Sequence, residues 1–264
     1  MNTVELNDIV VSYRRSGSGR PVVLLHGLAE DHRSWDPVAA HLGDFAVYAV
    51  DLRGHGRTTP GHGTGTLSQL SDDLAAFLRV VTGPATVVGY SLGGTIGLKA
   101  ATAPHSLIER LIVAATSSVV GGAAAEFFEG RIAQLESHDV EGFAAGLRDD
   151  TAQQIVTSYD IDAAASRRVD AVGDGRGYIN AARAMIGIRS EPLNPLLSQI
   201  DIPVDVIGAS DDVFCPRRAS DIIVEGIDDC RYHEIAGAGH LISVDQPDAY
   251  GKLLAELLAE RGSA

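Results

Sequence analysis

Short apolar runs that alternate with helix-like segments constrain this chain more than any other feature of its sequence. Val22–Leu25, Ala46–Val50, Ala85–Gly89 and Leu111–Ala115 are rich in β-branched and small apolar residues, a pattern typical of strands buried on both faces. Leu67–Val81 has apolar residues at spacings of three and four, as in an amphipathic helix. The alternation predicts an α/β fold with a mostly parallel central sheet and helices on both faces.

This alternation of strands and helices is interrupted in the middle of the chain. Between about Ser118 and Pro192 the sequence contains no convincing strand, and strand-like runs return only at Val204–Gly208 and Arg231–Ile235. We therefore expect one core domain, made of residues 1–117 and 193–264, with a helical lid inserted over residues 118–192. The helices expected in the insertion are Ala123–Leu135, Val140–Leu147, Thr151–Tyr159, Ala163–Val172 and Tyr178–Ile186.

Composition excludes several classes of function. The formal net charge is −14, which argues against binding to nucleic acid or to an anionic membrane surface. The two cysteines, Cys215 and Cys230, are too few for a disulfide framework and do not have the spacing of metal ligands. The N-terminal residues lack the basic and apolar regions of a signal peptide, and no apolar run approaches the roughly 20 residues of a membrane span. We therefore expect a cytoplasmic protein.

The segment Gly89-Tyr90-Ser91-Leu92-Gly93 matches the G-x-S-x-G pattern of a nucleophile elbow. The pattern alone is weak, but here the serine directly follows an expected strand and begins an expected helix. Glycines on both sides of the serine leave room for a sharp strand-to-helix turn, which would expose its hydroxyl above the sheet. Ser91 is therefore the candidate nucleophile.

A serine hydroxyl needs a base that accepts its proton. Of nine histidines, His240 is the best candidate, because it ends the glycine-rich loop Gly237-Ala238-Gly239-His240 between the last expected strand and the last expected helix. It also lies late in the chain, after the serine and after the place where the acid is expected. The alternative is a buried histidine with a purely structural role.

The acid of such a triad orients the histidine and stabilises its protonated form. The loop after Val204–Gly208 offers two adjacent carboxylates, Asp211 and Asp212, and its position alone leaves both open. For the oxyanion, two backbone N–H groups are expected, one from Leu92 after the nucleophile and one from Leu28 in the loop after Val22–Leu25. His26, in the same loop, is expected to be structural.

These motifs together resemble the α/β-hydrolase superfamily, and the resemblance covers essentially the whole chain. Its marks are His26-Gly27, the loop Asp51–Gly56, the elbow, the loop Asp212–Pro216 and Gly239-His240. Many members have an acid four residues before a proline and about 28 before the histidine. The resemblance therefore implies that Asp212 is the triad acid, with Asp211 as a turn or capping residue, and that the loop Asp51–Gly56 is a structural turn.

Within the superfamily the chain is most similar to 3-oxoadipate enol-lactonases and related small esterases. The segments Arg33–Pro37 and His240–Pro247 carry this likeness. Haloalkane dehalogenases and epoxide hydrolases have aspartate at the position of Ser91, and carbon–carbon hydrolases of ring-cleavage products typically have tryptophan where Leu241 stands. The resemblance therefore favours cleavage of an ester or lactone.

The sequence thus predicts a serine hydrolase that acts on a small-molecule ester or lactone through an acyl-enzyme, without metal or organic cofactor. Carbon–carbon hydrolysis or cofactor-free perhydrolysis by the same triad remains an alternative, as does a ligand receptor with very slow turnover. Arg183 and Arg189 in the insertion are candidates for binding a substrate carboxylate. The sequence does not predict the oligomeric state.

Overall fold

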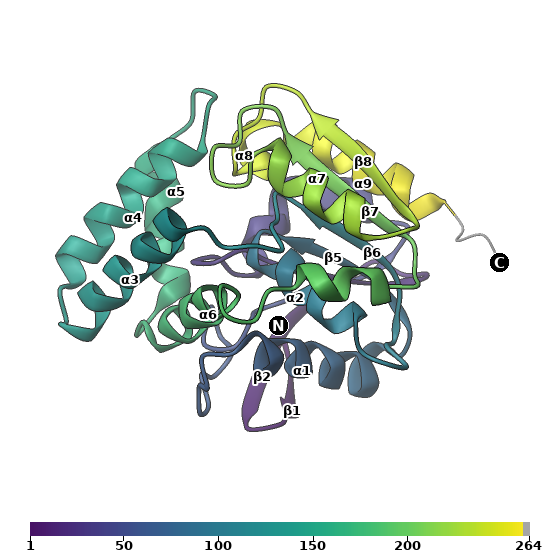
Figure 1. The fold of residues 1–264 in the computed structure, drawn as a ribbon, viewed down its shortest axis with the longest axis horizontal. Helices are drawn as coiled ribbons and strands as arrows, with labels where there is room; N and C mark the ends of the chain where they lie inside the picture. The colour runs from purple at the N-terminus through teal and green to yellow at the C-terminus, as the bar shows by residue number, and fades with distance from the viewer. Residues whose placement is uncertain (261–264) are drawn as a thin grey trace.

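One mixed sheet forms the centre of the molecule (Figure 1). The computed structural model describes residues 1–260, and within them eight strands lie in the order β1-β2-β4-β3-β5-β6-β7-β8. β1 and β2 pair with each other antiparallel, β2 pairs antiparallel with β4, and all other neighbours are parallel. The expected α/β-hydrolase architecture is confirmed. The strands are β1 (Asn2–Leu6), β2 (Ile9–Ser16), β3 (Pro21–Leu25), β4 (Ala46–Val50), β5 (Ala85–Tyr90), β6 (Ile108–Ala114), β7 (Val204–Ala209) and β8 (Cys230–Ile235).

The central parallel strands β3, β4 and β5 are apolar at nearly every position because both faces of the sheet are covered there. In β5, Val87 belongs to the apolar core on one face and Val88 to the core on the other. Successive side chains of a strand point to opposite faces, so a strand covered on both sides needs apolar residues at every position. This explains why the sequence pattern here is continuous rather than alternating.

Helices cover the two faces in separate groups. The core that contains Leu74, Ile96 and Ile223 packs α1, α2 and α7 against one face. The core that contains Trp35 and Leu254 packs η1, α8 and α9 against the other. These elements are η1 (His32–Leu42, a 3-10 helix), α1 (Leu67–Phe77) continued by η2 (Leu78–Thr82), α2 (Leu92–Ala101), η3 (Asn194–Gln199), α7 (Arg217–Gly226), α8 (Ile242–Asp245) and α9 (Pro247–Ala259).

The segment between β6 and β7 is helical, and its helices form a group beside the sheet, at the left in Figure 1. They share a small apolar core that includes Phe143, Leu147 and Tyr178, and Ala29 from the loop after β3 packs into it. α6 also contacts α1 in the main body. The helices are α3 (Gly122–Glu136), α4 (Val140–Gln154), α5 (Ile161–Val172) and α6 (Arg176–Gly187).

One helix predicted from the sequence is wrong. The sequence favoured separate helices at Val140–Leu147 and Thr151–Tyr159, but α4 runs unbroken to Gln154 and residues 155–160 are not helical. The backbone amides of Val156 and Thr157 instead donate hydrogen bonds to the carboxylate of Asp245, at 2.9–3.2 Å. A tertiary contact therefore overrides the local helical pattern here.

The loop Asp51–Gly56 supports the connection between α5 and α6. The Gly56 amide donates to the Ala171 carbonyl at 2.9 Å, and a Cβ on Gly177 would lie 2.1 Å from the Gly54 carbonyl oxygen. The Asp51 carboxylate accepts hydrogen bonds from the His32 and Arg57 amides. The loop is thus a structural turn. Within residues 1–260, no helix has both the length and the apolar character needed to cross a bilayer.

Candidate active site

Ser91 occupies a strained turn between β5 and α2. Its backbone has φ 50° and ψ −116°, a left-handed conformation that a residue with a side chain seldom adopts. A Cβ on Gly89 would lie 2.4 Å from the Gly93 carbonyl oxygen, and a Cβ on Gly93 would lie 2.3 Å from that of Leu25. Only glycine fits at these two positions, which accounts for the spacing of the motif.

His240 reaches Ser91 from the loop between β8 and α8. Its Nε2 lies 3.1 Å from Ser91 Oγ, within hydrogen-bond distance. The Tyr90 hydroxyl donates to the His240 carbonyl at 2.9 Å, and the tyrosine ring lies beside the imidazole. The ring of Phe214 also lies beside it, with 5.5 Å between ring centroids. The backbone and the ring of His240 are thus both held by neighbours.

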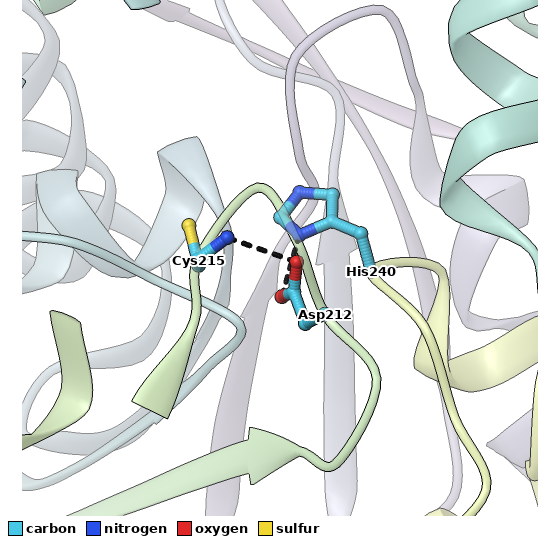
Figure 2. Close-up of side chains that lie close together, drawn as sticks. All are labelled: Asp212, Cys215 and His240. Atoms are coloured by element: carbon cyan, nitrogen blue, oxygen red, sulfur yellow. Dashed lines mark hydrogen bonds and ion pairs between the residues drawn. The ribbon is translucent and has the colours of Figure 1, made fainter. Parts of the chain in front are cut away.

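Asp212 lies in the loop after β7 and contacts the second nitrogen of the same imidazole. Its Oδ2 is 2.8 Å from His240 Nδ1, and its Oδ1 accepts the amides of Phe214 and Cys215 at 2.8 and 2.9 Å. Figure 2 shows the carboxylate between the imidazole and the Cys215 nitrogen. Burial raises the pKa of the Asp212 carboxyl, but the charge and hydrogen bond of His240 and the two amides outweigh burial, so the pKa lies below its usual value.

The neighbouring carboxylate takes no part in this contact. Asp211 is exposed, and its Oδ2 accepts a hydrogen bond from the Ser210 hydroxyl at 2.7 Å. Of the two acids that the sequence left open, the structure therefore brings Asp212 to His240 and leaves Asp211 in the turn.

The two expected oxyanion donors, Leu28 and Leu92, line the same cavity as Ser91 and His240. Leu92 is the first residue of α2, so its amide has no acceptor within the helix. In the loop after β3, the Gly27 amide already has an acceptor, because it donates a hydrogen bond to Glu30 Oε2 at 3.1 Å. His26 is buried and structural, since its Nε2 accepts the Leu52 amide at 2.9 Å.

A cavity of about 780 Å³ opens above Ser91. Its lining includes Phe127, Phe128 and Met185 from α3 and α6, together with Val213 and Phe214 from the loop before α7. The lining is mainly apolar, and its size is in the range of small-molecule sites. The nucleophile candidate therefore lines a roomy, mainly apolar cavity.

The two arginines that the sequence suggested for binding a substrate carboxylate lie outside this cavity. Arg183 forms an exposed ion pair with Glu136, and Arg189 is exposed just after α6; neither lines the cavity. Arg168 on α5 lines it instead. Sequence reasoning missed this residue because helical periodicity does not tell which arginine of α5 faces inward.

Asp245 is a second residue that the sequence did not single out. Its buried carboxylate accepts the Gly239 amide at 2.8 Å, next to His240, and also the amides of Val156 and Thr157. It therefore connects the histidine loop to the segment after α4. No local pattern in the sequence marks this role.

Two groups of potential metal ligands occur among the described residues. In the first, Cys215 accompanies Asp212 and His240, but burial and the Asp212 charge raise the pKa of its thiol well above the usual value, so the thiol stays protonated. In the second, the His32 ring lies 2.7 Å from Asp51, and Asp31 forms an ion pair with Arg33. Both groups are explained by contacts within the protein.

Fold and geometry together define an α/β protein of the hydrolase class, and the comparisons with known proteins agree. The model of the alpha/beta hydrolase family matches residues 22–253. The chain therefore belongs to the alpha/beta hydrolase family.

Curated relatives cover nearly the whole chain at low identity. RutD of Rhizobium rhizogenes, which bears the name of a carbamate hydrolase, is 27% identical over 92% of this chain and 94% of its own. The 3-oxoadipate enol-lactonase 2 of Acinetobacter baylyi is 27% identical over 94% of this chain and 93% of its own. The expected likeness to enol-lactonases is thus confirmed.

Solved structures share the fold. The enol-lactonase from Burkholderia xenovorans has a TM-score of 0.87 at 24% identity, covering 98% of this chain and 100% of its own. An esterase from Exiguobacterium antarcticum has a TM-score of 0.86 at 19% identity, covering 98% and 99%. At these identities the likeness concerns the fold alone.

Proposed function

We propose that this chain is a serine hydrolase that cleaves a carboxylic ester or lactone through an acyl-enzyme on Ser91. The observation that carries the proposal is the continuous contact from Ser91 Oγ to His240 Nε2 and from His240 Nδ1 to Asp212 Oδ2, at 3.1 and 2.8 Å. A nucleophile, a base and an orienting acid in this order are what acyl transfer requires.

In the first half of the reaction, Ser91 Oγ attacks the carbonyl carbon while His240 Nε2 takes the hydroxyl proton. Asp212 stabilises the resulting imidazolium through Nδ1. The amides of Leu28 and Leu92 stabilise the oxyanion of the tetrahedral intermediate. Collapse of this intermediate breaks the bond to the alkoxy oxygen, which receives the proton from His240.

In the second half, His240 takes a proton from water, and the hydroxide formed attacks the acyl-enzyme. The second tetrahedral intermediate expels Ser91 Oγ, which regains a proton from His240, and the acid product is released. No step in this scheme uses a metal or an organic cofactor.

We further propose that residues 118–192 form a lid over the active site and that residues 1–117 and 193–264 form the core. The walls that α3 and α6 contribute to the cavity support this division. A lid that excludes water strengthens the electrostatic interactions within the site.

The apolar cavity and the named activities of two relatives support an ester or lactone as substrate. One relative bears the name of an enol-lactonase and another that of a carbamate hydrolase. Lactones and carbamates both contain a carbonyl carbon bonded to oxygen, which a serine nucleophile can attack. A carbamate therefore belongs in the substrate panel. Carbon–carbon hydrolysis would be favoured by activity on a dienoic ring-cleavage product without activity on esters, and a receptor by tight binding with negligible turnover.

The first test is a burst assay with p-nitrophenyl acetate and butyrate on the wild type and Ser91→Ala. We expect p-nitrophenol release by the wild type and none above background by the variant. If neither protein releases product, labelling by a small fluorophosphonate separates two cases. Labelling at Ser91 would indicate an active but selective hydrolase, whereas an unlabelled serine would contradict the proposal.

A further inference from the structure

A second cavity, of about 300 Å³, adjoins the one above Ser91. It lies between the start of η1, α5 and α8, and its lining includes Ser34, Arg167 and Ser243. The two cavities share Glu30 and Arg168 as lining residues. Arg168 therefore belongs to the boundary between this side cavity and the main chamber.

Arg168 has hydrogen bonds but no counter-ion among the described residues. Its Nη1 donates to Thr151 Oγ1 at 2.9 Å and to Gln154 Oε1 at 2.6 Å, and its Nη2 lies 3.5 Å from the Leu28 carbonyl oxygen. All three acceptors are neutral. Within residues 1–260, its Nε is buried without a hydrogen-bond partner. A partly buried guanidinium with an unused donor is costly unless a hydrogen-bond acceptor binds to it, and an anion is the acceptor that also balances its charge.

The other charges of the side cavity leave room for such an anion. Asp31 is paired with Arg33 at 2.7 Å, and Asp36 is paired with Arg14. These pairs leave one other lining carboxylate, Glu30, and two other lining cations, Arg167 and Arg168.

The side cavity also offers a neutral donor. Ser34, which lines it, has a buried hydroxyl oxygen without a partner in the described part of the chain. A hydroxyl and a guanidinium fork are groups that bind a carboxylate.

We propose that Arg168 and the side cavity form a carboxylate-binding subsite of the active site; this inference rests on the proposed serine hydrolase function. The carboxylate has two possible sources. Hydrolysis of any ester or lactone produces an acid, which the subsite would take from the apolar chamber. Alternatively, the substrate itself carries a carboxylate remote from the bond that is cleaved.

Binding to the Ser91→Ala protein tests the subsite without turnover. Benzoate and benzamide have the same shape and differ in charge, so their affinities can be compared by titration calorimetry. We expect Arg168→Gln in this background to weaken benzoate roughly tenfold or more and to change benzamide by less than about twofold. Arg168→Lys keeps the positive charge but lacks the paired N–H donors of arginine. Its affinity for benzoate should lie between those of the Ser91→Ala parent and Arg168→Gln. Unchanged benzoate binding in Arg168→Gln would overturn the proposal.

Two variants control for charge and location. Arg189→Gln removes an exposed arginine that lines neither cavity and should bind benzoate as its Ser91→Ala parent does. Arg218 is exposed and lines the main cavity. Loss of benzoate binding in Arg218→Gln but not in Arg168→Gln would show that Arg218 binds the anion, and would contradict the proposed subsite.

Kinetics on the active enzyme then separates the two sources. The substrates are the p-nitrophenyl monoester of glutaric acid, which is anionic, and p-nitrophenyl valerate, which is neutral. A fall in kcat/KM of Arg168→Gln on the anionic ester alone would assign the subsite to the substrate. Weaker inhibition by the product acid, with kcat/KM unchanged on both esters, would assign it to the product.

Failure of the proposed function gives a different result. If Ser91 neither turns over esters nor reacts with a fluorophosphonate, the hydrolase proposal fails whatever benzoate does. An unchanged rate of Ser91 labelling in Arg168→Gln shows that the variant keeps an intact site. Equal kinetics and equal benzoate binding in such an intact variant would overturn the subsite while leaving the hydrolase proposal in place.

Discussion

Gly239 packs directly against the backbone of Gln154 at the end of α4. A Cβ at position 239 would lie 2.6 Å from the Gln154 carbonyl oxygen, and the Leu241 amide donates to the same oxygen at 3.1 Å. His240 stands between these two contacts. The position of the candidate base is therefore set by a segment that lies 86 residues earlier in the chain, since His240 and Gln154 differ by 240 − 154 = 86.

Gly239→Ala tests this relationship. The added methyl group must move the histidine loop or the end of α4, so we expect kcat/KM on a p-nitrophenyl ester to fall by roughly tenfold to hundredfold. Gly130→Ala on α3, where a Cβ would meet no atom within 4 Å, is the matched control and should keep wild-type activity. Equal activity of the two variants would mean that the contact does not position His240.

The two adjacent carboxylates should differ sharply in mutation. Asp212→Asn removes the charge that faces His240 Nδ1, and we expect kcat to fall by about 10³–10⁴, as for the acid of other serine triads. Asp211→Asn changes only an exposed turn residue and should lower kcat by less than about threefold. A larger loss in Asp211→Asn than in Asp212→Asn would contradict the proposed triad.

The strained backbone of Ser91 predicts a gain in stability when its side chain is removed. Ser91→Gly relieves the left-handed φ of 50°, and we expect it to be more stable than Ser91→Ala by about 1 kcal/mol in the free energy of unfolding. Urea denaturation of both inactive variants measures the difference. A less stable glycine variant would indicate that the elbow carries no strain that glycine relieves.

His55 should make the fold sensitive to acid. Burial and the neighbouring His26 lower the pKa of His55 to about 3, so its imidazole stays unprotonated in the native state. In the unfolded state the imidazole has its usual pKa of 6.5 and binds a proton below that pH. Between these two values the unfolded state binds more protons. Stability must therefore fall as pH decreases through this window, by up to about 1.4 kcal/mol per pH unit.

The test compares urea denaturation of the wild type and His55→Gln at pH 7 and pH 5. We expect the variant to lose less stability between the two values than the wild type, whatever its stability at pH 7. His62→Gln, which removes an exposed imidazole, serves as the matched control. An identical pH slope in the wild type and His55→Gln would show that His55 does not cause the acid sensitivity.

Features carried by local chemistry could be predicted from the sequence. The strand runs that become β3 to β7 are visible because both faces of the sheet are covered there, and the elbow around Ser91 because its glycines meet nearby backbone. The pairing of β1 with β2 at the edge of the sheet was not predicted, since a short hairpin half exposed to solvent has a weak pattern.

The local pattern also misled at one place and left one choice open. Thr151–Tyr159 looks helical, but Asp245 binds the backbone amides beyond Gln154 and holds them out of a helix. Asp211 and Asp212 are equivalent by local position, and the choice between them depends on which one meets His240.

The sequence by itself determined the class of fold, the turn at Ser91 and the order of the candidate catalytic residues, because these depend on periodicity and on backbone contacts within a few residues. Only the tertiary structure decided that Asp212 rather than Asp211 contacts His240, that Asp245 connects the histidine loop to the segment after α4, and that Arg168 rather than Arg183 lines the cavity. These outcomes depend on the direction of side chains across elements far apart in the chain, and periodicity within one element does not contain that information.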